Sequence, residues 1–333
     1  MPKRVSVVVP TYNSARFIGR AVRSIRRQGR SDMEIVVVDD GSHDETEQVV
    51  RELSEGNSEV ILCRNDRTKG PSGARNTGIL KASGQYIAFL DSDDEWLENH
   101  LSDGMRFLDG HPEIDVLFGN FEVVEHETNR HLFTWFDQKR TLLSLDALEI
   151  EEGFHSIQDN LFIALVKESS FHVSSAIIRQ DVCKNTLFNE SSCSSEDRDF
   201  AIRLDRRSGA AFAYRDEPTH IYYRHPTSLT GGNGLEDSKI LLKDTMYLYN
   251  GYLDEFELSK GERHTIRSLL SEDYLDLSYV QRKQSDFRAA VGSTVSSARN
   301  RLGVGCVIEL AKIAGEWVLS RRNLAKNQDC VRR

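Results

Sequence analysis

Two short apolar runs in this chain each end in a cluster of acids. They are EIVVVDDGSHDET at 34–46 and YIAFLDSDDEW at 86–96. Runs of about five Ile, Val, Leu and Phe residues indicate strands buried on both faces, which is typical of a parallel sheet covered by helices. In such sheets, ligands bind beyond the carboxyl ends of the strands. The pattern therefore predicts an acidic binding site at one edge of an α/β sheet.

The acids of both clusters are expected to lie close together at that edge. Asp39 and Asp40 follow the first run, and Asp91, Asp93 and Asp94 follow the second. Like charges repel at such a spacing unless a cation or a hydrogen-bond donor on a ligand balances them. The local inference is a site for a divalent metal together with a nucleotide.

Composition narrows the class of protein. A chain of 333 residues is long enough for two domains, or for one large domain with an appendage. The formal net charge of -9 argues against a dedicated nucleic-acid binder. The five cysteines are scattered and show no CxxC spacing, so neither a disulfide framework nor a cysteine zinc site is indicated. With no signal-like or membrane-spanning apolar run, we expect a cytoplasmic protein.

The first hundred residues alternate between strand and helix patterns. A Ser-His-Asp-Glu capping-box pattern at 42–45 predicts the start of the helix that follows the second strand. A loop rich in Gly, Pro and Ser at 69–73 precedes the next helix, expected at 74–82. This rhythm predicts an α/β sandwich with right-handed crossovers. The expected strands are 5–9, 35–38, 60–63 and 86–90.

The rhythm loosens after Trp96 and becomes helical from Leu235 onward. A Gly-Gly-Asn-Gly run at 231–234 is typical of a linker or a loop. We therefore expect a catalytic domain followed by a helical C-terminal extension. The expected boundaries are 1–230 for the domain, with a nucleotide-binding half at 1–110 and an acceptor half at 111–230, and 235–333 for the extension.

Five motifs in this order and spacing resemble the family 2 glycosyltransferases over about 3–225. They are PTYN at 10–13, DDGSHDET at 39–46, GPSGARNTGI at 70–79, DSDD at 91–94 and EDRDFAIRL at 196–204. The resemblance implies the nucleotide-diphospho-sugar transferase fold called GT-A, with a mainly parallel central sheet flanked by helices. It also implies sugar transfer with inversion at the anomeric carbon.

The resemblance also implies where the donor nucleotide binds at the sheet edge. Asp40 is expected to accept a hydrogen bond from a uracil-like base, with Pro10 and Tyr12 forming one wall of the base slot. Arg75 is expected to reach a ribose or phosphate with its planar fork of donors. The competing structural roles are helix capping for Asp39 and Asp40, and for Arg75 an ion pair with an acid of the DSDD motif.

The DSDD motif is the metal motif by resemblance. Asp93 is the expected direct ligand, and Asp91 is expected to be shared between the ribose and the metal. Hard oxygen ligands suit Mn²⁺ or Mg²⁺, which would offset charge developing on the leaving diphosphate. Asp94 and Glu95 are instead expected to be N-terminal acids of the next helix, stabilised by its dipole.

The second acidic pair supplies the chemistry in this family. Asp197 is the expected general base, with Glu196 orienting it or reaching the metal through water. An exposed acidic helix start is the alternative for both. His225 matches a basic position that often follows this helix in the family, and is expected to meet the diphosphate or the metal, with a structural role as the alternative.

The predicted function is metal-dependent, inverting transfer of a sugar from a nucleoside diphosphate, with UDP favoured, to a hydroxyl of a glycan or lipid-linked acceptor. A nucleotidyltransferase and a catalytically silent binding or scaffold protein are the alternatives. Near the C-terminus, apolar residues recur with helical spacing beside basic residues. The pattern fits either core packing or docking on the catalytic domain, on another subunit or on the inner face of a membrane. The apolar residues are Val304, Val307, Ile308, Ala311, Ile313 and Trp317.

Overall fold

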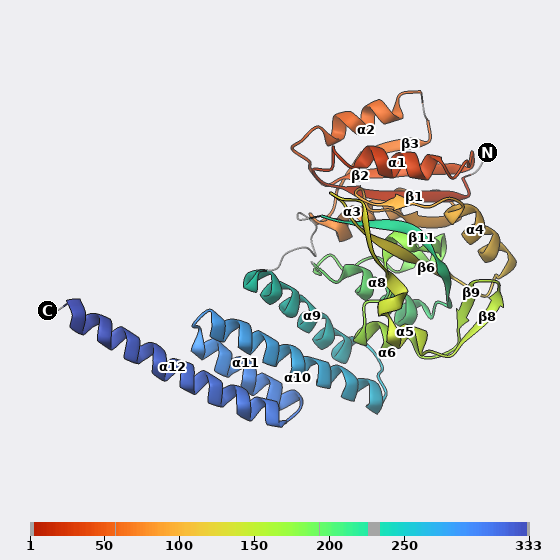
Figure 1. Cartoon of the computed structure of the whole chain (residues 1–333). Helices are drawn as coiled ribbons and strands as arrows, with labels where there is room; N and C mark the ends of the chain where they lie inside the picture. The colour runs from red at the N-terminus through yellow and green to blue at the C-terminus, as the bar shows by residue number, and fades with distance from the viewer. Residues whose placement is uncertain (1–2, 57, 193, 226–233, 332–333) are drawn as a thin grey trace. The chain divides into compact units, whose positions relative to one another are not determined.

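A mixed sheet forms the centre of the first unit of the chain, Met1–Gly231, in the strand order β3-β2-β1-β4-β10-β6-β11-β9-β8 (Figure 1). The structure is a computed structural model that describes residues 3–56, 58–192, 194–225 and 234–331, with side chains up to residue 319. A second unit, Gly232–Arg333, is helical. The predicted linker at 231–234 lies outside the described residues except for Gly234.

The parallel strands come first along the chain. β1 pairs with β2 and β4, and β2 pairs with β3, all in parallel. β10 then runs antiparallel to β4 and β6, whereas β6 and β11 are parallel. The strands are β1 Val5–Thr11, β2 Met33–Asp39, β3 Val60–Arg64, β4 Tyr86–Phe89, β5 Glu95–Trp96, β6 Val116–Glu125, β7 Arg130–Thr134, β8 Ala147–Glu151, β9 Phe154–Ile157, β10 Ile177–Arg179 and β11 Phe212–Arg224.

Helices cover both faces of the parallel strands. Alternate side chains of β1 and β2, such as Val7 and Val37, pack in one core with helix residues such as Ile25 and Val50. The other face of β2 meets Ala74. The helices of this unit are α1 Ile18–Arg26, α2 Thr46–Ser54, α3 Pro71–Lys81, α4 His100–Gly110, α5 Arg140–Leu143, α6 Leu161–Lys167, α7 Gln180–Asn185 and α8 Glu196–Ser208, with 3-10 turns η1 Trp135–Gln138 and η2 Val173–Ser175.

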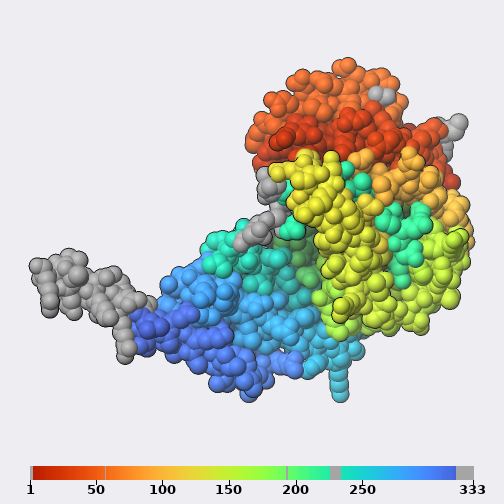
Figure 2. All heavy atoms as spheres, in the orientation of Figure 1, coloured from red at the N-terminus to blue at the C-terminus, as the bar shows by residue number. Residues whose placement is uncertain are grey.

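The register of the parallel strands brings the predicted site residues to one edge. Thr11 at the end of β1 lies beside Asp39 at the end of β2, and Val8 lies beside Phe89. The segments that leave these strands therefore begin at the same edge. In the space-filling view, the segment around β7, drawn in yellow, runs over the surface of this unit (Figure 2).

The predicted capping box at 42–45 is wrong. α2 begins at Thr46, where the Asp44 carboxylate accepts a 3.0 Å hydrogen bond from the Thr46 amide. The hydroxyl of Ser42 donates instead to Asp39. A capping box needs its serine at the helix start, but here the preceding turn uses it.

The helix predicted to follow DSDD also begins later than expected. Glu95 lies in the short strand β5, and α4 starts at His100. Asp94 is buried and accepts a hydrogen bond from the Tyr223 amide at 3.2 Å. Glu95 pairs with Arg27. Neither acid stabilises the dipole of a helix, so that interpretation is wrong for both.

Close packing fixes α3 against the sheet. A Cβ added at Gly78 would lie 2.3 Å from a methyl carbon of Val8 in β1. One added at Gly73 would lie 1.9 Å from the backbone oxygen of Thr68. Both positions therefore require glycine, because the neighbouring chain occupies the space of a side chain. The Gly-rich motif allows α3 to approach the ends of β1 and β2.

The second unit consists of four helices joined by short connections: α9 Leu235–Glu255, α10 Lys260–Lys283, α11 Phe287–Asn300 and α12 Val304–Val331. α10 begins with a capping box, in which Ser259 and Glu262 exchange hydrogen bonds. Buried hydroxyls join α10 to α11, with Ser278 2.9 Å from Thr294. Ser271 and Ser297 lie 2.8 Å apart, as do the Ser293 hydroxyl and Gln281. We call these three contacts the hydroxyl seam.

α12 presents an apolar stripe to solvent. At 100° per residue, Val304, Val307, Ile308 and Leu319 fall on one side of the helix, and Val304 is 75% exposed. Ile313 falls on the opposite side and is buried. Ala311 and Trp317 are exposed as well. Core packing, one of the interpretations of the six residues predicted for this stripe, therefore holds only for Ile313. Among the helices of the described part of the chain, none is long and apolar enough to cross a membrane.

We predict that Gly78→Ala lowers the free energy of unfolding by about 1–3 kcal/mol, because the new methyl group overpacks against Val8. Gly19 in α1 is the matched control. Its Cβ would meet only the mobile end of Arg23, at 3.1 Å. Gly19→Ala should be neutral or stabilise by up to about 1 kcal/mol. Urea denaturation measures both, and equal effects of the two substitutions would contradict the packing argument.

Candidate active site

A single buried arginine connects the two acidic motifs. Arg75 in α3 is 3% exposed, and its guanidinium lies 2.7 Å from a carboxylate oxygen of Asp91. The same guanidinium lies 3.2 Å from Glu196 and 3.4 Å from Asp197, at the start of α8. The neighbouring carboxylates raise the pKa of Arg75, although burial opposes them. The predicted structural role of Arg75, an ion pair with an acid of DSDD, is therefore confirmed for Asp91. Arg75 also pairs with Glu196 and Asp197 of the EDRD motif.

The environment of the second acidic pair favours protonation. Burial raises the pKa of Asp197 to about 6, against the opposing charge of Arg75. Burial, followed by the charge of Asp197, also raises the pKa of Glu196. One oxygen of Asp197 accepts a 2.9 Å hydrogen bond from the Val173 amide, whereas the other is buried without a hydrogen bond among the described residues and faces the Arg75 guanidinium at 3.4 Å. Both oxygens of Asp197 thus face protein groups.

The three aspartates of DSDD differ in their surroundings. Burial alone would raise the pKa of Asp91, but Arg75 outweighs it and lowers that pKa. Asp93 is the most open, and its carboxylate lies 2.8 Å from the imidazole of His225. Burial, together with the charges of Asp93 and Asp91, raises the pKa of Asp94 well above its usual range. Among the three, Asp93 thus presents an open carboxylate with a second metal-ligating side chain beside it.

Arg20 was missed as a site residue. Its guanidinium donates a 2.5 Å hydrogen bond to the backbone oxygen of Asp93 and stacks 3.6 Å from the ring centre of Tyr223. It thereby holds the DSDD turn against β11. The arginines of α1 were visible in the sequence, but their helical spacing assigns them to a polar face without naming a partner.

The predicted base slot lies at the ends of β1 and β2. Tyr12 is exposed, with the amine of Lys69 4.4 Å from its ring centre. Asp40 accepts hydrogen bonds from the Asn65 amide group at 2.5 Å and from the Gly70 backbone amide at 2.8 Å. Both oxygens of Asp40 thus fix the loop before α3. A base donor would have to use their remaining lone pairs.

Asp39 serves the turn after β2. Its carboxylate accepts hydrogen bonds from the backbone amides of Gly41 and Ser42, both at 3.2 Å. Neither Asp39 nor Asp40 caps α2.

Ser174 supports the DSDD turn from a distant part of the sequence. Its hydroxyl accepts a hydrogen bond from the Asp91 amide, and its backbone carbonyl accepts one from the indole of buried Trp96. Ser174 and Trp96 therefore support the backbone at the DSDD turn.

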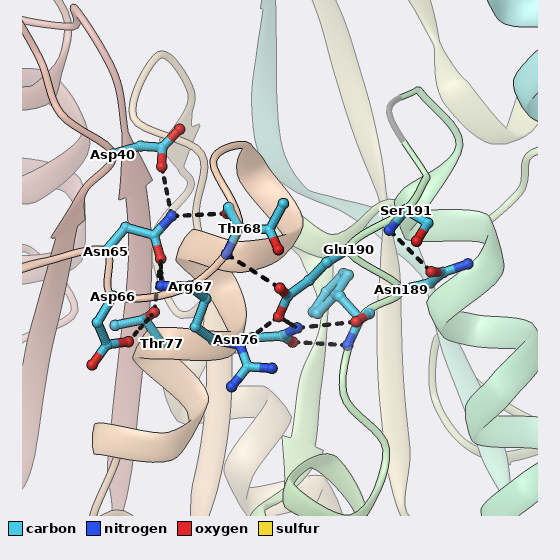
Figure 3. Close-up of polar contacts among 11 residues, drawn as sticks. Asp40, Asn65, Asp66, Arg67, Thr68, Asn76, Thr77, Asn189, Glu190 and Ser191 are labelled. Atoms are coloured by element: carbon cyan, nitrogen blue, oxygen red, sulfur yellow. Dashed lines mark hydrogen bonds and ion pairs between the residues drawn. The ribbon is translucent and has the colours of Figure 1, made fainter.

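Glu190 joins the loop before α3 to the segment that precedes α8 (Figure 3). Its carboxylate forms an ion pair with Arg67 and accepts hydrogen bonds from the Thr68 amide at 3.3 Å and from Asn76 at 2.8 Å. Asn76 also exchanges two hydrogen bonds with the backbone of Phe188, at 2.8 and 3.0 Å. Glu190 lies outside the five motifs, so the sequence offered no signal for it.

Phe188 carries this connection to the acidic pair. Its ring stacks on Phe200 of α8, with centres 3.8 Å apart, and lies 5.4 Å from the Arg75 guanidinium. The loop before α3 and the start of α8 are thus held by one continuous set of contacts. This set places the two acidic motifs on opposite sides of Arg75.

The family model for "Glycosyl transferase family 2" matches residues 6–185. The chain belongs to this family. The match includes the first four motifs, and the resemblance inferred from them is confirmed.

Two similar proteins are named as β-1,3-glucosyltransferases that act on undecaprenol-linked acceptors. A β-1,3-glucosyltransferase of Escherichia coli, WfgD, is named for transfer from UDP-Glc to α-D-GlcNAc-diphosphoundecaprenol. It is 37% identical over 124 residues, which cover 37% of this chain and 48% of that protein. A Campylobacter jejuni GalNAc(5)-diNAcBac-PP-undecaprenol β-1,3-glucosyltransferase is 33% identical over 215 residues, 54% of this chain and 67% of its own length. The chain thus spans about half of the first relative and two thirds of the second.

Solved structures share the fold. TarS of Staphylococcus aureus, in complex with UDP-GlcNAc, superposes with a TM-score of 0.57 at 19% identity, covering 95% of this chain and 92% of that chain. The Pyrobaculum calidifontis mannosyltransferase PcManGT, in complex with GDP-Man and Mn²⁺, gives 0.58 at 17% identity, covering 97% and 89%. The predicted GT-A fold is confirmed.

We predict that Glu190→Ala lowers the free energy of unfolding by about 1–3 kcal/mol, because it removes the acceptor of one N–H of the buried Asn76 side chain and the hydrogen bond from the exposed Thr68 amide. Glu190→Gln is the control, since it keeps an acceptor oxygen and should cost less.

The two variants should also differ in pH dependence. Although burial opposes it, hydrogen bonding from Asn76, Thr68 and Arg67 lowers the pKa of Glu190 from 4.5 to about 2. Its contribution to stability is therefore full above pH 4.5 and lost as the pH falls toward 2. Denaturation curves between these pH values should show that loss in the native protein but not in Glu190→Gln. Parallel curves would contradict the role of the ionised carboxylate.

Proposed function

We propose that this chain transfers a sugar from a UDP-sugar to a hydroxyl of a lipid-linked glycan, with inversion at the anomeric carbon and with a divalent metal. The observation that carries the proposal is the position of Arg75 between Asp91 and Asp197. It puts the donor motif and the candidate base within reach of one bound substrate. The names of the relatives support the UDP donor and the undecaprenol-linked acceptor.

On the donor side, the exposed ring of Tyr12 and the end of β1 at Pro10 form the proposed wall of the base slot. Asp40 is the proposed acceptor for a base N–H. Asp91, held by Arg75, is placed to accept from a ribose hydroxyl. The guanidinium of Arg75 is buried and pairs with Asp91. Its role in this proposal is therefore to hold Asp91, and the phosphates are expected to contact more exposed side chains.

The residues at the sheet edge fit a divalent metal. Asp93 offers a hard, partly exposed oxygen, and His225 lies beside it with a nitrogen ligand. Asp91 is the second proposed ligand from the same motif, although its carboxylate is shared with Arg75. Mn²⁺ or Mg²⁺ held there would offset the charge that develops on the leaving diphosphate.

Asp197 is the proposed general base. Its carboxylate takes the proton from the acceptor hydroxyl while the hydroxyl oxygen bonds to the anomeric carbon. The bond from this carbon to the diphosphate oxygen breaks, and its electron pair leaves with the diphosphate. Attack from the face opposite the leaving group converts an α-linked donor into a β-linked product. Glu196 and Arg75 hold Asp197 in place.

We propose that the apolar stripe of α12 contacts the surface of the membrane that carries the acceptor lipid. Its exposed residues and the basic sequence beyond it, with Arg321, Arg322 and Lys326, suit an interfacial helix. A contact between two copies of the chain is the alternative occupant, and binding to vesicles separates the two. A membrane contact would place the protein in the cytoplasm at the inner face of the membrane.

Asp197→Asn should lower turnover by about 100-fold to 10,000-fold, the range for loss of a general base, with little change in donor affinity. In the native enzyme the rate should fall below about pH 6, because Asp197 becomes protonated there. This acid limb should be missing in the variant. The anomeric proton coupling of the product reports β linkage. A retained configuration, or near-native turnover of Asp197→Asn, would contradict the mechanism.

Asp93→Asn should abolish metal-dependent donor binding, because it removes the open anionic ligand of the cation. Titration calorimetry with UDP, with and without Mn²⁺, measures this. Asp109→Asn is the control, since Asp109 forms an ion pair with Arg4. Chelator should inactivate the native protein and added Mn²⁺ should restore it. Full activity in chelator would remove the metal from the mechanism.

A double variant, Val307→Glu with Leu319→Glu, should weaken binding to anionic vesicles at least about tenfold, since burying each apolar side chain contributes about 1.5–3 kcal/mol. Val291→Glu with Val295→Glu in α11 is the matched control, because these residues are also exposed and apolar. Co-sedimentation measures binding. If the native protein stays in the supernatant, the membrane contact is excluded, and a dimer detected by light scattering would assign the stripe to a second copy.

A further inference from the structure

Three polar side chains, two buried and one partly exposed, converge behind the DSDD turn. They are Asp94, from the turn before β5, His172, which precedes η2, and His220 in β11. One ligand atom from each lies within 4.8 Å of the other two. The arrangement differs from the proposed donor-metal site, which uses the neighbouring Asp93 and His225.

Several polar atoms of these three side chains lack a hydrogen-bond partner within the described part of the chain. Oδ2 of Asp94, Nδ1 of His172 and both ring nitrogens of His220 are buried without hydrogen bonds. His220 has no solvent exposure, and Asp94 is 1% exposed. Buried polar groups are nearly always hydrogen-bonded or bound to an ion, because leaving them unpaired costs about 1–3 kcal/mol each. Unpaired atoms at this spacing indicate an occupant between them.

The rings are held by aromatic neighbours. His172 and His220 stack with centres 5.1 Å apart, and Phe121 packs against both, at 4.8 and 4.6 Å. The His220 backbone pairs with Trp96. Ring packing, rather than hydrogen bonds among the three side chains, therefore fixes the positions of His172 and His220.

The chemistry of the unpaired atoms at this centre favours a metal ion as the occupant. One carboxylate oxygen of Asp94, one nitrogen of His172 and both nitrogens of His220 lack hydrogen bonds from the described residues, and one ligand atom from each side chain lies within 4.8 Å of the other two. Carboxylate oxygens and imidazole nitrogens are all metal ligands. Two imidazoles and one carboxylate form a set that suits zinc better than magnesium or manganese.

We propose that Asp94, His172 and His220 bind one Zn²⁺ ion that ties the DSDD turn to η2 and β11. Tetrahedral zinc with bonds of about 2.0–2.2 Å holds its ligand atoms roughly 3.4 Å apart. Since these atoms now lie within 4.8 Å of one another, the side chains draw together by at most about 1.4 Å on binding. His172 is partly exposed, and the fourth ligand is a water on its side. The ion is structural, and the inference does not depend on the transferase activity.

The test is metal content of the full-length protein, measured by inductively coupled plasma mass spectrometry after dialysis in zinc and gel filtration. The native protein should retain one zinc per chain. His172→Gln and His220→Gln should each lose it. Cobalt loaded in its place should give the intense visible absorption of a tetrahedral site, and zinc should raise the melting temperature of the native protein.

Two controls separate this site from the donor-metal site and from the general loss of a buried histidine. His100 is another buried histidine, packed against Trp96 with ring centres 4.6 Å apart and outside the cluster, so His100→Gln should retain zinc. Asp93→Asn should lose the manganese response of the donor site and still retain zinc. Because His220→Gln could fail to fold, circular dichroism checks each variant, and the partly exposed His172 then carries the test.

Two results would overturn the proposal. A native protein that retains no zinc and shows no cobalt absorption would assign the centre to a buried water. Zinc lost on Asp93→Asn but retained in His172→Gln would assign the ion to the donor site. Failure of sugar transfer leaves these measurements unchanged, so the two proposals fail separately.

Discussion

The charge balance around Arg75 is the interaction on which the rest of the site depends. One guanidinium, almost wholly withdrawn from water, faces carboxylates from the end of β4 and from the start of α8. Removing it would leave these charges uncompensated in a buried setting, which is far more costly than the loss of a surface ion pair. The same cation keeps Asp91 ionised, while burial keeps the pKa of Asp197 high. The carboxylates of the two acidic motifs beside Arg75 thus have pKa values shifted in opposite directions.

The acids of the DSDD turn illustrate how neighbours in sequence diverge in chemistry. Asp91 forms an ion pair with Arg75, Asp93 is partly exposed beside His225, and Asp94 is buried behind the turn. Backbone direction separates them, because consecutive side chains leave a turn on different sides. The motif therefore specifies at least two environments, and counting acids does not reveal which of them can meet a ligand.

Sequence patterns predicted the parts of the structure that depend on local repetition. The buried strands and the edge where Asp40 and Asp91 emerge follow from apolar runs and parallel topology. The capping box at 42–45 failed because Asp39 takes the serine hydroxyl for its own turn. Glu190 and His220 could not be found, because each acquires its role from residues far away along the chain. No local pattern records such contacts.

The hydroxyl seam between α10 and α11 has a consequence for how this helical pair can be used. Apolar helix faces tolerate sliding, since one methyl group replaces another, whereas hydroxyl pairs are directional and satisfied only in one alignment. A shift by one turn would leave several buried donors unpaired at once. The hydroxyl contacts therefore favour a single alignment of α10 against α11. A helical hairpin whose register is set by its own side chains is suited to use in designed bundles.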